Sequence, residues 1–102
     1  MFMRVLWVVT ACAALCGCQA HRQPVAGDAA RGQATFRASC AICHNADSRD
    51  KKVGPGLRSV AQRESEAAIR AKIDHGGNGM PPFGDVLSAG EEDNLVAYLA
   101  TL

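Results

Sequence analysis

The chain has 102 residues, with 11 lysines and arginines against 10 acidic residues and a formal net charge of +1. This length allows one small domain, which usually needs a covalent staple or an oligomer to be stable. The balanced charge, without a basic tract, argues against nucleic acid as a partner. A charged fraction of 21% in a mixed composition excludes a chain that is disordered throughout.

The first segment has the layout of a secretory signal peptide. Arg4 is the only charge before position 21, and the apolar run Val5–Leu15 follows it. That run is too short to cross a bilayer as a helix, which takes about 20 apolar residues. A charged start, a short apolar stretch and then small residues predict an exported chain from which residues 1–17 are removed.

The end of this leader, Leu15-Cys16-Gly17-Cys18, resembles the lipobox of bacterial lipoproteins. The resemblance implies cleavage before Cys18, whose sulfur carries a diacylglycerol and whose new amino group is acylated. Two or three acyl chains on one residue give stable membrane attachment. We therefore expect residues 18–27 to tether the protein to the periplasmic side of a bacterial membrane. The alternative is ordinary cleavage nearby, which gives a soluble periplasmic protein.

Residues 28–102 are expected to form one folded domain that begins with a helix. Asp28 is a good N-cap, and Ala29–Cys40 contains good helix formers. Gly32 and Phe36 are four residues apart, so they lie on the same face of this helix.

The helix leads into Cys40-Ala41-Ile42-Cys43-His44, a C-x-x-C-H string. Of the five cysteines, two leave with the leader and Cys18 takes lipid, so Cys40 and Cys43 are left as a pair. Two thiols three residues apart can add across the two vinyl groups of haem as thioethers, and the next imidazole then meets the iron from one face. The sequence therefore predicts one covalent haem c held by Cys40 and Cys43, with His44 as an axial ligand of the iron.

Two other kinds of site use paired cysteines. A thioredoxin-like redox pair belongs on a strand-to-helix turn, and the sequence shows no strand run to build one. A zinc site needs four ligands, and only His21, His75 and carboxylates are left to complete it, without a second paired motif. Both alternatives are less favoured than haem.

The pattern after this pentad is helical. Val60-Ala61-Gln62 is expected to be a short turn, and Glu66–His75 a helix that ends at Gly76-Gly77. Nowhere do apolar and polar residues alternate for long enough to predict a strand, so the fold class is all-α.

The last helix opens with the capping box Ser88-Ala89-Gly90-Glu91. Its acidic residues at positions 91–93 are better interpreted as helix-start charges than as a catalytic cluster, because the positive end of the helix stabilises them. Apolar side chains then recur at the spacing of a buried helical face: Leu95, Tyr98, Leu99 and Leu102.

Three further features complete a resemblance to a known family: the segment Val53-Gly54-Pro55-Gly56-Leu57, the segment Gly79-Met80-Pro81-Pro82-Phe83, and the closing amphipathic helix. With the pentad, they make residues 27–102 resemble a class I monohaem cytochrome c. The resemblance implies three to five short helices around one covalently bound haem c, with the first and last helices crossing. In that family a glycine on the first helix permits the close crossing and an aromatic residue follows one turn later, and Gly32 and Phe36 match these positions.

The resemblance also implies two further site residues. Met80 matches the methionine that supplies the second axial ligand, and it is the only methionine after the leader. Pro55 matches the proline whose carbonyl accepts a hydrogen bond from the ligating histidine, which would fix the tautomer of His44. The rival ligand is His75, which we interpret as a surface histidine at a helix end. The alternative for Met80 is core packing.

An iron with both axial positions filled has no open site, which suits outer-sphere electron transfer. The expected function is a one-electron carrier, not an enzyme, that accepts from a quinol-oxidising complex or a dehydrogenase and delivers to a terminal oxidase or reductase. The alternatives are a haem-based sensor, in which Met80 dissociates and a small molecule binds, and a dedicated electron-transfer subunit of one dehydrogenase. The segment Arg49-Asp50-Lys51-Lys52 is a candidate basic rim for an acidic partner, with an ordinary solvated loop as the alternative.

Overall fold

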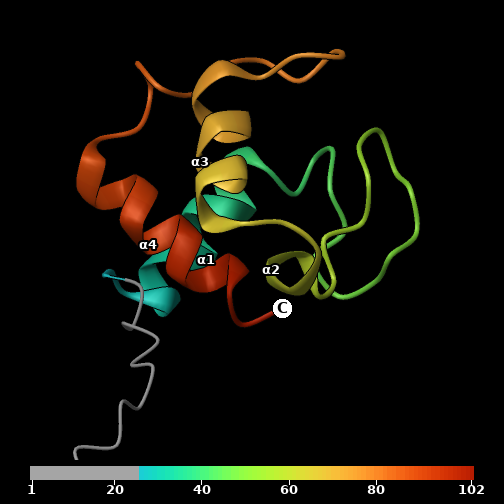
Figure 1. The fold of residues 1–102 in the computed structure, drawn as a ribbon, viewed down its shortest axis with the longest axis horizontal. Helices are drawn as coiled ribbons and strands as arrows, with labels where there is room; N and C mark the ends of the chain where they lie inside the picture. The colour runs from blue at the N-terminus through green and yellow to red at the C-terminus, as the bar shows by residue number, and fades with distance from the viewer. Residues whose placement is uncertain (1–25) are drawn as a thin grey trace, which may run out of the picture.

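The computed structural model describes residues 26–102, shown as a coloured ribbon in Figure 1. Four helices follow one another in the chain: α1 (Ala29–Ser39), α2 (Val60–Arg63), α3 (Glu66–His75) and α4 (Ala89–Leu99). Within residues 26–102 the β pairing is limited to an isolated bridge between Gly77 and Met80. The all-α prediction is therefore confirmed. The predicted leader, the predicted lipidation site Cys18 and the predicted tether up to residue 25 lie outside the described residues.

Three of the helices begin where a short polar side chain caps the first turn. The Asp28 carboxylate accepts hydrogen bonds from two backbone N–H groups of α1, at 2.9 and 3.2 Å. Ser65 and Ser88 do the same for α3 and α4, each at 3.1 Å. These caps satisfy N–H groups that have no partner inside the helix. Helix α1 ends one residue earlier than predicted, with Cys40 as its C-cap, and the predicted turn at 60–62 is a single helical turn.

Helices α1 and α4 pack against each other and cross, as Figure 1 shows. At the crossing Gly32 approaches the backbone of Asn94 so closely that a side chain has no room. The Asp28 backbone N–H donates to the Asn94 side-chain oxygen at 2.8 Å. One turn later, the rings of Phe36 and Tyr98 meet with their centroids 5.4 Å apart and tilted by 56°, an arrangement that aromatic pairs favour.

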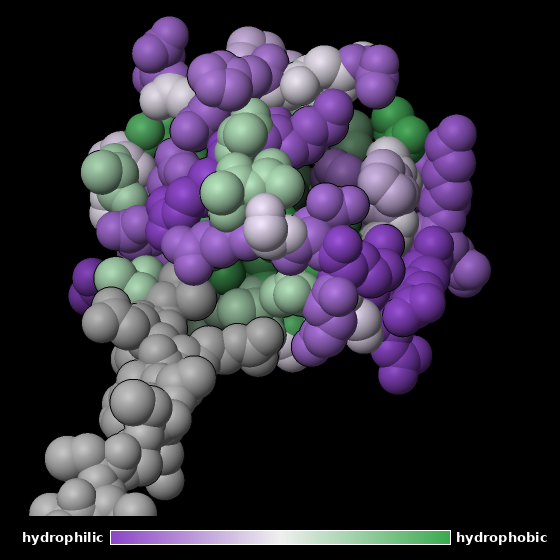
Figure 2. All heavy atoms as spheres, in the orientation of Figure 1, coloured by the Kyte–Doolittle hydropathy of each residue, from purple (hydrophilic) through white to green (hydrophobic). Residues whose placement is uncertain are grey.

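The core consists of eight buried apolar side chains from all four helices: Phe36, Val60, Ile69, Ile73, Leu95, Val96, Tyr98 and Leu99. Leu102, predicted on the same face, lies just after α4 and is only partly buried against this cluster. The face drawn in Figure 2 is mainly polar, with scattered apolar side chains. No helix of residues 26–102 has the length and the apolar character that a membrane span requires.

A polar network joins α3 to α4. The Arg70 guanidinium contacts Glu66 on its own helix at 2.9 Å, and Glu92 and Asp93 on α4 at 3.3 and 2.8 Å. Burial alone would lower the pKa of Arg70, but these three carboxylates raise it above its ordinary value. The acidic residues at the start of α4 therefore also hold α3 in place.

Candidate functional site

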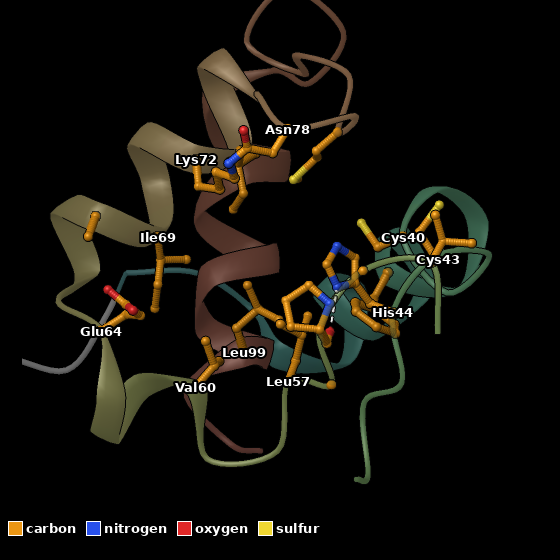
Figure 3. Close-up of a pocket in the computed structure, with 18 of the residues that line it drawn as sticks. Cys40, Cys43, His44, Leu57, Val60, Glu64, Ile69, Lys72, Asn78 and Leu99 are labelled. Carbon is orange, nitrogen blue, oxygen red and sulfur yellow. Dashed lines mark hydrogen bonds between the residues drawn. The ribbon is translucent and has the colours of Figure 1, made fainter. Parts of the chain in front are cut away.

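A cavity of about 560 Å³ lies inside the helical shell and receives side chains from all four helices. Its walls are mainly apolar, and its volume is in the range of small-molecule and cofactor sites. In Figure 3 the labelled Cys40, Cys43 and His44 lie on one side of this cavity, with Ile69 and Glu64 on the opposite side. Leu57, Val60 and Leu99 close it at the bottom of the view.

The turn that follows α1 places the two cysteines at the cavity. The N–H groups of Cys43 and His44 both donate to the Cys40 carbonyl, at 3.1 and 3.0 Å. This tight turn brings both half-buried free thiols to the same wall. Burial raises the pKa of the Cys40 thiol, and its neighbour Cys43 raises it further.

The same geometry separates this site from the two other uses of paired cysteines. The reactive thiol of a redox pair gains its low pKa from a positive environment such as a helix N-terminus, whereas Cys40 and Cys43 follow the C-terminal end of α1. In the described part of the chain, no three histidine, cysteine or acidic side chains gather to hold a metal ion directly.

The imidazole of His44 is oriented by the loop that follows it. Its Nδ1 atom lies 2.8 Å from the Pro55 carbonyl oxygen. A carbonyl oxygen can only accept, so Nδ1 carries the proton and donates it. The other ring nitrogen, Nε2, is then left with its lone pair free, as a ligand to a metal requires.

Met80 reaches the same cavity from a tight turn after α3. Gly77 and Met80 bond to each other through their backbones, at 2.9 and 3.1 Å. Between them Asn78 and Gly79 have φ values of 55° and 87°, which fits the two-residue turn that Asn-Gly favours. The structure thus brings Cys40, Cys43, His44 and Met80 together around one cavity.

Two features predicted from the sequence do not line this cavity. His75 is exposed at the end of α3 and does not line the cavity. Arg49, Lys51 and Lys52 are exposed on the loop after the pentad, where the Lys52 ammonium donates to the Ala41 carbonyl at 2.8 Å.

Polar side chains that the sequence did not single out also line the cavity, among them Arg63, Lys72 and Asn78. Lys72 donates to the Gly77 carbonyl at 3.1 Å and so links α3 to the turn that carries Met80. Its signal in the sequence was its place in the last turn of a helix, where a lysine can bond to free carbonyls. Arg63 donates to the carbonyls of Gly56 and Arg58, and nothing local in the sequence indicates that contact.

Residues 27–99 match the family described as "Cytochrome C oxidase, cbb3-type, subunit III". The chain is 40% identical over 77 residues to the "Cytochrome c-553-like" protein of Synechocystis sp., which covers 74% of this chain and 70% of that protein. It is 36% identical over 76 residues to "Cytochrome c6" of Aphanizomenon flos-aquae, over 71% of this chain and 87% of that one. The solved structure of cytochrome c6 from the diatom Phaeodactylum tricornutum superposes with a TM-score of 0.60 and 31% identity, over 74% of this chain and 93% of that chain.

Proposed function

This chain belongs to the class I monohaem cytochrome c family, and on that premise we propose which of its residues hold the haem and where it works. Proteins of this family carry electrons on one covalent haem c and are not enzymes. The chain is accordingly an electron carrier. Its residues fit that cofactor, since the mainly apolar cavity of about 560 Å³ has two free thiols and a free imidazole nitrogen on one wall.

We assign the covalent attachment to Cys40 and Cys43. Each thiol would add across one vinyl group, with the sulfur bonded to one vinyl carbon and the thiol proton ending on the other. Cys40 and Cys43 share one tight turn and both line the cavity, so together they would hold the cofactor from one wall. Covalent attachment is useful outside the cytoplasm, where a lost cofactor is not easily replaced.

We assign the axial positions to Nε2 of His44 and the thioether sulfur of Met80. The observation that carries this assignment is the His44–Pro55 hydrogen bond of 2.8 Å, because it fixes the tautomer and makes the imidazole a better donor. When bound, haem iron supplies a one-electron ferric–ferrous couple. The Met80 thioether is a soft ligand that favours the ferrous state, and the apolar wall disfavours the extra charge of the ferric state, so both raise the potential.

The proposed place of work is the periplasmic side of a bacterial membrane, with Cys18 as the lipid anchor. The leader and its lipobox support this location. The proposed donor is a quinol-oxidising complex or a dehydrogenase, and the acceptor a terminal oxidase or reductase. The matched family's description names a subunit of a cbb3-type oxidase, which supports an oxidase as the acceptor.

The test is to express the full chain in a host that matures c-type cytochromes. We expect haem to stay with the denatured polypeptide, both thiols to resist alkylation, and the ferric protein to show the weak red band of methionine-ligated haem. A colourless product with free thiols would overturn the assignment of Cys40 and Cys43. Rapid carbon monoxide binding by the ferrous protein at neutral pH would favour the sensor over the carrier.

A further inference from the structure

Gly54 lies directly against the imidazole of His44. A β-carbon placed on Gly54 would meet Cε1 of the ring at 2.6 Å, Nδ1 at 3.0 Å and Nε2 at 3.1 Å. The added β-carbon would be almost equally far from the two ring nitrogens, and only slightly closer to Cε1, which lies between them. The added carbon would therefore sit over the flat face of the ring, since an approach in the ring plane would leave both nitrogens much farther away.

Space, rather than backbone conformation, is what requires a glycine here. The φ of Gly54 is not in the left-handed region, unlike those of Gly76, Gly77 and Gly79, so its φ does not demand a glycine. At Gly32 the obstacle to a side chain is the backbone of α4. At Gly54 the obstacle is the imidazole itself, so a substitution there must displace either the ring or the loop that faces it.

The backbone of Gly54 is fixed on both sides. Its N–H donates to the Cys43 carbonyl at 2.7 Å, and its carbonyl accepts from the Lys52 N–H at 2.9 Å. The next residue, Pro55, accepts the proton of the His44 ring at 2.8 Å. The ring is thus held at its edge by Pro55 and bounded on its face by a short, hydrogen-bonded piece of backbone.

We propose that Gly54 is a positioning residue, whose bare backbone sets the orientation of the His44 imidazole relative to the iron. This inference rests on the proposed function, because it takes His44 as the axial ligand. An alanine at this position pushes the ring away from the Pro55 carbonyl and weakens the Nδ1–H bond. A more weakly polarised imidazole donates less to iron, which stabilises the ferric state less and raises the reduction potential.

The test compares three holoprotein variants, matured in the same host. Gly54→Ala adds one carbon against the imidazole. Gly32→Ala adds one carbon against the α4 backbone, outside the cavity, and Gly90→Ala adds one in open space. For each we measure the reduction potential, the g values of the ferric haem by electron paramagnetic resonance, and the deuterium exchange of the His44 Nδ1 proton by NMR.

For Gly54→Ala we expect covalent haem, shifted g values and faster exchange of the Nδ1 proton. We also expect the equilibrium between ferric and ferrous haem to move toward the ferrous state by up to about tenfold, which is a rise of about 59 mV in the one-electron reduction potential. Gly32→Ala should lose stability while its haem signals and Nδ1 exchange change far less than those of Gly54→Ala, and Gly90→Ala should match the wild type in those signals. If Gly54→Ala loses stability while its potential, g values and exchange stay those of the wild type, Gly54 is structural only and the proposal fails.

Two results separate this proposal from the haem assignment. If the wild-type protein holds no covalent haem, or its ferric spectrum lacks a histidine ligand, the proposed function fails first. If Gly54→Ala alone yields no holoprotein, the test is made by NMR on the ferrous wild-type protein. A nuclear Overhauser contact between the Gly54 α-protons and the His44 ring would support the proposal, and the absence of that contact would overturn it.

Discussion

Gly32 of α1 touches the backbone carbonyl of Asn94 in α4, at a separation that leaves no space for a β-carbon. This contact, together with the 2.8 Å bond from the Asp28 N–H to the Asn94 side chain, fixes how the first and last helices cross. The crossing in turn sets where Phe36 and Leu95 meet the cavity.

Replacing Gly32 by alanine should therefore destabilise the holoprotein, although alanine is the better helix former by about 1 kcal/mol. Forcing the helices apart typically costs about 1–3 kcal/mol, which outweighs that gain. Thermal and denaturant unfolding measure the effect. Gly90→Ala, whose new carbon meets nothing within 4 Å, is the matched control and should be neutral or slightly stabilising. Equal stability of the two variants would contradict the close crossing.

Met80→Ala should keep covalent haem but lose the weak red band of the ferric protein. With the thioether gone, the ferrous state loses a favoured ligand, so the potential should fall and carbon monoxide should bind quickly. Absorption spectra and redox titration measure these changes. His75→Ala is the control, because His75 is exposed and does not line the cavity. Survival of the red band in Met80→Ala, or its loss in His75→Ala, would show that the ligand is assigned wrongly.

Glu92 should make stability depend on pH. Burial raises its pKa above the ordinary value of 4.5, and Asp74 beside it raises the pKa further, against the opposing effect of Arg70. The buried Asp74 Oδ1 has no hydrogen-bond partner, and the Asp74 side chain lies close enough to Glu92 to raise its pKa. The folded state thus binds the Glu92 proton more tightly than the unfolded state, so ionisation of Glu92 lowers stability as the pH rises from below 4.5 through the raised pKa.

Glu92→Gln lacks that ionisation. Its free energy of unfolding, relative to that of the wild type, should therefore increase with pH across this window and level off above it. Unfolding curves at a series of pH values measure the difference. Asp74→Asn removes the neighbouring carboxylate and should weaken the pH response of the wild-type Glu92. If the free energies of unfolding of Glu92→Gln and the wild type differed by the same amount at every pH, ionisation of Glu92 would not affect stability and the prediction would be wrong.

Removal of haem should leave a largely unfolded chain. Six of the eight core side chains line a cavity of about 560 Å³, and without a group to fill it they lose much of their packing. We expect the double variant Cys40→Ser, Cys43→Ser to show little helix by circular dichroism. A cooperative, native-like melt of haem-free protein would disprove this.

Cys18→Ser should release the mature protein from the membrane fraction into the soluble periplasm. The expected cause is the loss of the acylated sulfur, with the leader then removed by ordinary cleavage nearby. Cys12→Ser, which changes only the predicted leader, is the control and should leave the protein in the membrane. Continued membrane attachment of Cys18→Ser would mean that the chain is not anchored through this residue.

Much of the local structure follows from the sequence because its causes lie within a few residues. Asp28 and Ser88 start helices through their own side chains, and the predicted helix Glu66–His75 has the same bounds as α3. The predicted end of the first helix was one residue late. Cys40 still bonds to the Phe36 carbonyl but no longer continues the helix, and such terminal turns depend on the loop that follows.

By itself, the sequence determined the helices and the C-x-x-C-H string, since each is a pattern of near neighbours. Only the tertiary structure decided that Lys72 holds the Met80 turn and that Gly54 faces the His44 ring. Those relations depend on where α3, α4 and the loops settle around the cavity. That arrangement comes from the packing of side chains distant in sequence, which no local pattern encodes.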